Sequence, residues 1–136
     1  FLKEEIIPHI EKQYRTTSNR LFWGASLGGS LGEILLSQEK DKTPYFQTYA
    51  LSDGAFWANP PEVQQELTVS LLQPKTENIS ILTSGTRQGN YLSNLDFINR
   101  LKSLNNTSLD LQNIELKETH NEMATPTFEH YIDAMH

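Results

Sequence analysis

The chain has 136 residues, of which 37% are hydrophobic and 21% are charged, and this composition is typical of a globular domain and excludes a disordered or collagen-like chain. The net charge is -6 and there is no basic cluster, which argues against a nucleic acid as the main partner. Cysteine is absent, so disulfides and thiolate metal sites are excluded, and the sequence is compatible with both the cytoplasm and the periplasm.

The first predicted elements are a helix and a buried strand. Apolar residues recur every four positions from Leu2 to Tyr14, which predicts a helix over about residues 1–14. After a polar connector, the apolar run LFWGA at 21–25 predicts a buried strand, with Trp23 in the core. No apolar run approaches the roughly 18 residues that would predict a membrane span.

The rest of the chain alternates predicted strands and helices. Further strands are expected at 46–53, 79–85 and 109–118. Helices are expected at 27–38 (apolar face Leu27, Leu31, Ile34 and Leu35), at 62–73, along the stripe Tyr91, Leu95, Ile98 and Leu101, and along the terminal stripe Phe128, Tyr131, Ile132 and Met135. This alternation predicts an α/β architecture with a mostly parallel sheet and right-handed crossovers.

Both ends of the sequence have helical patterns without the usual boundary signals. The chain begins without Met and without a signal-peptide pattern, and no glycine cap follows the last apolar stripe. We therefore expect residues 1–136 to form a single domain that is truncated, with the N-terminal strands of its sheet absent.

The motif G-x-S-x-G, formed by Gly24, Ser26 and Gly28, lies where the first predicted strand meets the next helix. This context is typical of a nucleophile elbow, whose sharp turn requires positions two before and two after the serine to lack side chains. At the helix N-terminus, free backbone N–H groups favour developing negative charge, so the N–H of Leu27 is a candidate half of an oxyanion hole. The alternative is that the glycines, Gly29 included, only allow close packing of the helix on the strand.

A serine nucleophile needs a base, for which histidine is the usual side chain near neutral pH. His9, His130 and His136 fall within predicted helices, which favours surface or packing roles. His120 instead follows the fourth predicted strand, and catalytic groups of open α/β sheets gather at the carboxyl ends of strands. It also follows Ser26 in the chain, as the histidine does in this hydrolase architecture.

Three segments carry a resemblance to a known family. IIPHIEKQYRTTSNRLFWGASLGGSLGEILL, FQTYALSDGAFW and ETHNEMATPTF resemble the esterase family of α/β-hydrolases that includes esterase D and the ferric-enterobactin and siderophore trilactone esterases. The resemblance implies the C-terminal part of an α/β-hydrolase fold. It also implies hydrolysis of carboxylic esters, with Ser26 as nucleophile and His120 as general base, and with a siderophore ester as one candidate substrate.

The acid that orients the histidine departs from the family pattern. The fold usually supplies it just after the strand that corresponds to ISILTSG, but the loop GTRQGN that follows here has no Asp or Glu. Asp53 at the end of the preceding strand is the favoured candidate, and its alternative role is that of a turn or capping residue. Asp96 lies well into a predicted helix, while Glu118 and Glu122 are too close in sequence to His120 to reach the far side of its ring. A Ser-His dyad without an acid is a further alternative.

Several expectations concern the substrate and the partners. By resemblance, Trp57 borders the pocket, although an aromatic residue at such a position is often part of the core. Arg87, at the end of the third predicted strand, is a candidate for receiving an anionic substrate group, or else a solvated loop residue. No spacing of His and carboxylate residues resembles a metal site, and we expect no cofactor.

Two other functions remain open beside the serine esterase. One is a non-catalytic α/β-hydrolase-like binding domain, which the missing acid favours. The other is acyl transfer to an acceptor other than water. In the family, the second oxyanion N–H comes from a loop before the first helix, and that loop is absent here, so we expect a missing N-terminal segment or another chain to complete an active protein.

Overall fold

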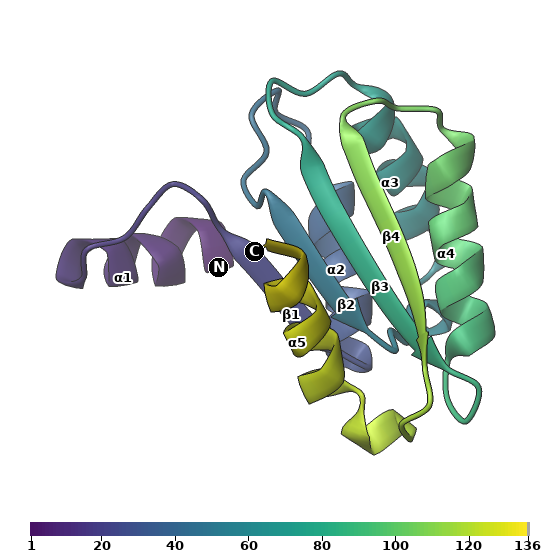
Figure 1. Ribbon diagram of the computed structural model, residues 1–136. Helices are drawn as coiled ribbons and strands as arrows, with labels where there is room; N and C mark the ends of the chain where they lie inside the picture. The colour runs from purple at the N-terminus through teal and green to yellow at the C-terminus, as the bar shows by residue number, and fades with distance from the viewer. Residues whose placement is uncertain (136) are drawn as a thin grey trace.

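In the computed structural model, which describes residues 1–135, a parallel sheet of four strands forms the centre of the protein (Figure 1). The strands lie in the order β1-β2-β3-β4. Their bounds are Leu21–Ala25 for β1, Thr48–Ser52 for β2, Ile79–Thr86 for β3 and Leu109–Leu116 for β4. Because every neighbouring pair is parallel and each pair is joined by a helix, the predicted α/β class and parallel sheet are confirmed.

The helices form two layers. Their bounds are Ile7–Gln13 for α1, Leu27–Ser37 for α2, Pro61–Leu72 for α3, Tyr91–Ser103 for α4 and Ala124–Met135 for α5. Short helical turns lie at Leu2–Ile6 (a π-helix, η1), Phe56–Ala58 (3₁₀, η2) and His120–Glu122 (3₁₀, η3). Figure 1 shows α2 and α3 behind the sheet, α4 at its right beside β4, and α5 in front of it, while α1 extends from the β1 side. Residues of α4 share one core with residues of α2 and α3.

The main core lies between the sheet and the layer of α2, α3 and α4. Side chains alternate along the strands, so that Tyr49 and Leu51 of β2 face this layer. The core contains Leu35, Leu36, Phe46, Tyr49, Leu51, Phe56, Leu67, Leu71, Ile79, Ile81, Phe97, Ile98 and Leu101. The rings of Phe56 and Phe97 stack with centroids 4.1 Å apart, which ties η2 to α4.

Two expectations about apolar side chains are wrong. On α2, Leu35 is buried, but Leu27 and Leu31 are exposed, because they lie outside the buried face of the helix. That face consists of Gly29, Ser30, Gly32, Glu33, Leu35, Leu36 and Ser37. A Cβ at Gly32 would lie 2.4 Å from the Leu51 side chain, so this close packing has no room for a larger residue. Trp23, predicted for the core, is 45% exposed, since alternation places it on the opposite face, against the ring of Phe128 in α5.

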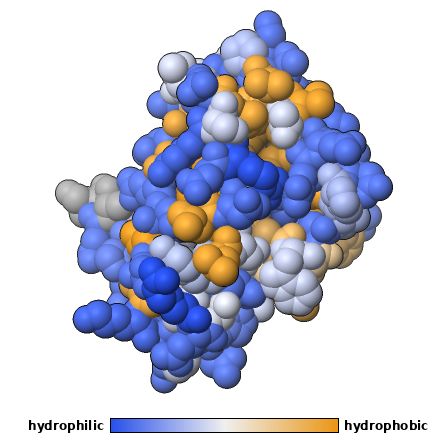
Figure 2. Space-filling view, turned by 90° about the vertical axis from the view of Figure 1, so that its right-hand side faces the viewer, coloured by the Kyte–Doolittle hydropathy of each residue, from blue (hydrophilic) through white to orange (hydrophobic). Residues whose placement is uncertain are grey.

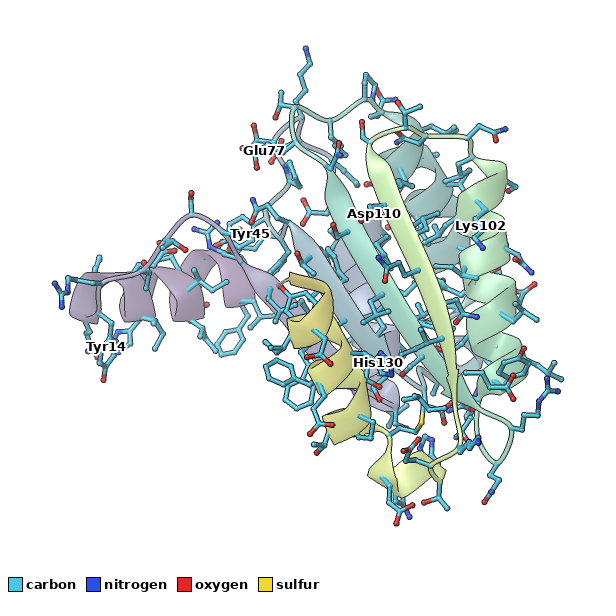
Figure 3. All side chains as sticks on the ribbon, in the orientation of Figure 1. Tyr14, Tyr45, Glu77, Lys102, Asp110 and His130 are labelled. Atoms are coloured by element: carbon cyan, nitrogen blue, oxygen red, sulfur yellow. The ribbon has the colours of Figure 1, made fainter. Side chains whose placement is uncertain are left out.

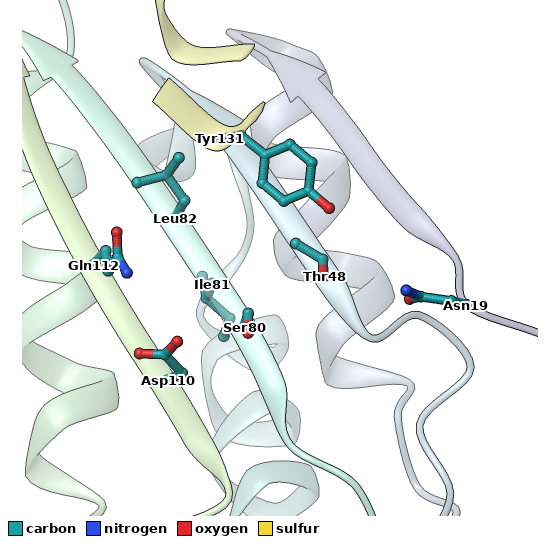
Figure 4. Close-up of a pocket in the computed structure, with 8 residues that line it drawn as sticks. All are labelled: Asn19, Thr48, Ser80, Ile81, Leu82, Asp110, Gln112 and Tyr131. Carbon is teal, nitrogen blue, oxygen red and sulfur yellow. The ribbon is translucent and has the colours of Figure 1, made fainter. Parts of the chain in front are cut away.

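The face of the sheet that carries α5 is only partly covered. Below α5 it forms a polar hollow of about 190 Å³, lined by Thr48, Ser80, Asp110 and Gln112 from three strands and by Tyr131 from α5 (Figure 4). Figure 3 shows Asp110 on β4 and Tyr14 beyond α1, away from the sheet.

The side of the molecule with α4 and β4 is mostly hydrophilic, with separate hydrophobic patches (Figure 2). None of the helices in residues 1–135 is long and apolar enough to cross a membrane.

Candidate active site

Segments that follow all four strands meet at one edge of the sheet. Ser26 follows β1, Asp53 follows β2, the loop 86–90 follows β3, and His120 follows β4 after a short connection. Because the strands are parallel, their carboxyl ends lie at the same edge, where open α/β sheets bind their ligands. The fold therefore brings together side chains that are far apart in the sequence.

Ser26 occupies the sharp turn between β1 and α2. Its φ of 54° and ψ of -114° are unusual for a residue with a side chain, and such strain costs on the order of 1–3 kcal/mol. Ser26 stands at the N-cap position of α2, yet its hydroxyl does not cap the helix. Instead Ser26 Oγ lies 3.0 Å from His120 Nε2. This is the distance that a general base needs to take the hydroxyl proton.

The glycines around Ser26 differ in what they do. A Cβ at Gly24 would lie 2.3 Å from the carbonyl oxygen of Gly28, and a Cβ at Gly29 would lie 2.7 Å from the Cα of Gly54. A Cβ at Gly28 would meet nothing within 4 Å among the described residues. The expectation that both flanking glycines avoid a clash thus holds for Gly24 and is wrong for Gly28, because a Cβ at Gly28 would point into open space.

Leu27 is the first residue of α2, and its side chain is 66% exposed. The N–H groups of a first helical turn have no carbonyl partner within the helix. The Leu27 N–H therefore belongs to the positive end of α2, next to the Ser26 hydroxyl.

His120 links Ser26 to Asp53. His120 Nδ1 hydrogen-bonds Asp53 Oδ2, on the opposite side of the ring from the nitrogen that faces Ser26. The His120 side chain is 33% exposed and that of Asp53 is 1% exposed, so the acid is buried while the imidazole borders the solvent. The order of contacts, serine to histidine to carboxylate, is that of a catalytic triad.

The Asp53 carboxylate is held by backbone N–H groups of the loop after β3. The N–H of Thr86 donates to Oδ1 at 3.0 Å, and that of Asn90 donates to Oδ1 at 3.0 Å and to Oδ2 at 3.1 Å. Gly89 passes so close that a Cβ there would lie 2.1 Å from Oδ2. The loop that would carry the acid by family resemblance thus cradles an acid supplied by the neighbouring strand.

The other acidic candidates have different partners. Asp96 Oδ2 lies 3.3 Å from Arg100 Nε. Glu122 closes a capping box with Thr119, whose hydroxyl and N–H hydrogen-bond the Glu122 carboxylate and lower its pKa. Among residues 1–135, Asp53 is the acidic residue that hydrogen-bonds the ring of His120, and Glu118 makes no such contact.

The remaining histidines lie away from this edge of the sheet or outside the described residues. His9 lies on the exposed surface of α1, where its Nε2 is 3.1 Å from Gln13 Nε2. His130 is exposed on α5 (Figure 3). His136 lies outside the described residues.

Trp57 and Arg87 line a shallow hollow beside the acid, together with Gly89, Asn90 and Tyr91. Trp57 is 70% exposed, and its Nε1 donates to Asn90 Oδ1 at 2.9 Å. Arg87 pairs with Glu115, with 2.6 Å between Nε and Oε1, and the hydrogen bond and charge of Glu115 raise its pKa. Its guanidinium group also lies over the ring of Tyr91. Arg87 is therefore already engaged by a carboxylate.

Sequence reasoning missed three polar residues that support the site. Asn90 and Asn94 bind the backbone at Asp53 and Gly54, and Thr127 of α5 binds Ser52 and Ser84 below the site. A signal for the first two was present, since two asparagines spaced by four residues share one face of a helix that begins at a strand's carboxyl end. No group of three or more His, Cys, Asp or Glu residues able to hold a metal ion occurs in the described part of the chain.

Comparison with solved structures shows which fold this is. An IroE-like serine hydrolase from Shewanella oneidensis superposes with a TM-score of 0.79 at 21% identity, over 96% of this chain and 44% of that protein. The BES protein from Bacillus cereus superposes with a TM-score of 0.78 at 22% identity, over 96% of this chain and 50% of that protein. A protein from Capnocytophaga ochracea DSM 7271 gives 0.72 at 13% identity, over 98% of this chain and 37% of that protein.

These likenesses establish the fold, a parallel α/β sheet with flanking helices that is shared with part of each of these proteins. The chain spans half or less of the length of each of the three proteins. No protein-family model matches the sequence, and no curated protein matches it significantly.

Proposed function

We propose that this chain is the catalytic part of a serine hydrolase that cleaves carboxylic esters through an acyl-enzyme on Ser26. The observation that carries the proposal is the continuous series of contacts from Ser26 Oγ to His120 Nε2 and from His120 Nδ1 to Asp53. Likeness in fold to an IroE-like serine hydrolase adds support. A structural serine in a turn would need neither the histidine nor the buried acid behind it.

In the first half of the reaction, Ser26 Oγ attacks the carbonyl carbon of the ester while His120 Nε2 takes the hydroxyl proton. Asp53 accepts a hydrogen bond from His120 Nδ1, which orients the ring and stabilises the imidazolium. The Leu27 N–H donates to the oxyanion. When the tetrahedral intermediate collapses, the bond to the alcohol oxygen breaks and His120 gives its proton to the departing alcohol.

In the second half, His120 takes a proton from water, and the resulting hydroxide attacks the acyl carbon of the acyl-enzyme. Collapse breaks the bond to Ser26 Oγ, which recovers its proton from His120, and the carboxylic acid leaves. If an alcohol replaces water in this step, the same residues perform acyl transfer. The siderophore-type substrate implied by the sequence resemblance is one ester among those that a product assay would compare.

Trp57 contacts the substrate in this proposed function, and Arg87 has a smaller role. The exposed indole of Trp57 offers an apolar surface next to the acid. An anionic substrate group would have to compete with Glu115 for Arg87. We further propose that a segment outside residues 1–136 supplies the second oxyanion donor, whose loss costs roughly 10² to 10³ in kcat.

The test is covalent labelling of the full-length natural polypeptide with a fluorophosphonate, followed by mass spectrometry of the adduct. We expect labelling on Ser26 that is abolished in Ser26→Ala, falls sharply in His120→Ala, and is unchanged in Ser18→Ala, a surface control. Absence of labelling in a protein shown to be folded would overturn the proposal in favour of a binding domain. Labelling accompanied by ester formation in the presence of alcohols would identify an acyltransferase.

A further inference from the structure

The turn after β2 places Asp53 in a conformation that the surrounding chain must maintain. Asp53 has a φ of 42°, in the left-handed region that residues with side chains rarely adopt. It is also almost fully buried. A backbone of this kind persists when its neighbours hold it at several points. The residues that do so are Asn90, the N-cap residue of α4, and Asn94 in its first turn.

Asn90 binds Asp53 through both its main chain and its side chain. Besides the N–H that donates to the carboxylate, Asn90 Nδ2 donates to the main-chain carbonyl of Asp53 at 2.9 Å. On the other side of the amide, Asn90 Oδ1 accepts the indole N–H of Trp57. Because an indole N–H only donates and a carbonyl oxygen only accepts, these two partners fix the orientation of the amide group.

Asn94 holds the next residue and also Asn90. Its Oδ1 accepts the N–H of Gly54 at 3.2 Å, and its Nδ2 donates to the carbonyl of Gly54 at 3.1 Å and to that of Asn90 at 2.8 Å. The side chain is fully buried, so these bonds have no competition from water. Asp53 and Gly54 are thus attached to the start of α4 by two asparagines that are four residues apart and lie on one side of the helix.

We propose that Asn90 and Asn94 form an asparagine clasp that positions Asp53 for His120, and that the Trp57 indole holds Asn90 in its working orientation. The clasp rests on the function proposed above, which it deepens by naming positioning residues. The clasp is needed because the acid and its hydrogen-bond donors come from different segments. Asp53 follows β2, whereas the N–H groups that bind its carboxylate belong to the loop after β3, so the two segments must be held at a fixed distance. Trp57 then affects kcat through Asn90, in addition to any contact with substrate.

The experiment measures kcat and KM for ester hydrolysis by the full-length polypeptide. Asn90→Ala is expected to lower kcat about 10- to 100-fold with KM nearly unchanged, because the acid and histidine lose their alignment. Trp57→Phe keeps an aromatic ring and removes the N–H, and we expect a smaller fall of the same kind. Asn99→Ala, the same substitution at an exposed position of the same helix away from the hollow, is the matched control and should leave kcat unchanged.

A double-mutant cycle separates positioning from general destabilisation. If Asn90 acts through Asp53, adding Asn90→Ala to Asp53→Asn should lower kcat little further, whereas an independent structural effect would multiply with that of Asp53→Asn. A rise in KM alone in Trp57→Phe would overturn the part of the proposal that concerns Trp57. An unchanged kcat in Asn90→Ala, in an enzyme that Ser26→Ala inactivates, would overturn the clasp and leave the proposed function standing.

An NMR measurement tests the clasp without an activity assay, and therefore also applies if the protein is not an esterase. The proton on His120 Nδ1 should give a low-field NMR signal that disappears in Asp53→Asn. We expect Asn90→Ala to shift or broaden this signal, while Asn99→Ala leaves it in place. An unchanged signal in Asn90→Ala would overturn the clasp whatever the activity of the protein.

Discussion

At the residue scale, alanine substitutions at the two glycines that flank Ser26, Gly24 and Gly28, are expected to have different effects on stability. We expect Gly24→Ala to destabilise the fold by at least about 1–3 kcal/mol, because its Cβ would press on the rigid Gly28 carbonyl. Gly28→Ala, in open space on a helix, should be neutral or slightly stabilising. Urea unfolding of both variants measures the difference. Equal losses of free energy of unfolding would show that the crowding at Gly24 can relax.

Tyr49 provides a prediction about alkaline pH. Burial, followed by the charge of Glu39 and its hydrogen bond to the phenol, raises the pKa of Tyr49 above its ordinary value. The protonated phenol is therefore favoured by the folded state. Its contribution to stability is fully present below the unfolded pKa of about 10 and is lost as the pH rises, by up to roughly 1.4 kcal/mol per pH unit.

The measurement is the free energy of unfolding in urea at several values from about pH 8 to about pH 11, for the protein and for Tyr49→Phe. Tyr49→Phe should be less stable near neutral pH, because Glu39 loses its phenol donor. Its stability should fall less steeply at alkaline pH. Parallel curves for the two proteins would show that Tyr49 ionises normally in the folded state.

At the scale of elements, a buried hydroxyl near the start of α5 binds the sheet just after the His120 turn. Thr127 Oγ1 donates to the carbonyl of Met123 at 2.7 Å and lies 2.9 Å from Ser52 Oγ and 2.5 Å from Ser84 Oγ. A hydroxyl has a single proton, so both serines must donate to Thr127. The start of α5, directly after the His120 turn, is thereby fixed over β2 and β3.

Thr127→Val keeps the shape of this side chain and removes its hydrogen bonds. We expect a loss of about 1–3 kcal/mol of stability, because the buried hydroxyls of Ser52 and Ser84 lose their acceptor. The rate of fluorophosphonate labelling at Ser26 should fall as well, since α5 follows His120. Thr127→Ser, which keeps the hydroxyl, is the control. If Thr127→Val were destabilised but labelled at Ser26 at the full rate, the packing of α5 on the sheet would not be what places His120.

At the scale of the whole molecule, β1 is an edge strand of the sheet. Within residues 1–135, β1 pairs with β2 along one edge and with no strand along the other. Apolar side chains are exposed on the same side, including Trp23 of β1 and Ile6 and Ile10 of the first helical segment. Open edges and exposed apolar groups of this kind promote association.

We therefore predict that residues 1–136 alone self-associate or precipitate and are nearly inactive, whereas a longer polypeptide that covers the free edge of β1 is soluble. Sedimentation velocity at increasing protein concentration, combined with an ester hydrolysis assay, measures both properties. Trp23→Lys should reduce the association of the 136-residue chain. A monomeric and fully active 136-residue chain would contradict this prediction.

How far the sequence predicts the site depends on the residue. Ser26 could be named because local chemistry marks it: glycines, an apolar strand and a helix start are all within a few positions. His120 could be named because parallel strands share an edge. Asp53 could be favoured but not distinguished from a dyad, since its contact with His120 depends on a strained turn and on a loop 33 to 37 residues further along the chain.

Strand and helix alternation, the parallel sheet and the serine turn follow from the sequence, because periodicity and glycine placement are local properties. Tertiary structure alone decided that Trp23 is half exposed, that α2 packs through glycines, and that Asn90, Asn94 and Thr127 support the site. The physical reason is that burial and hydrogen-bond partners depend on which layer covers each face of the sheet, and this is settled only when segments distant in the chain pack together.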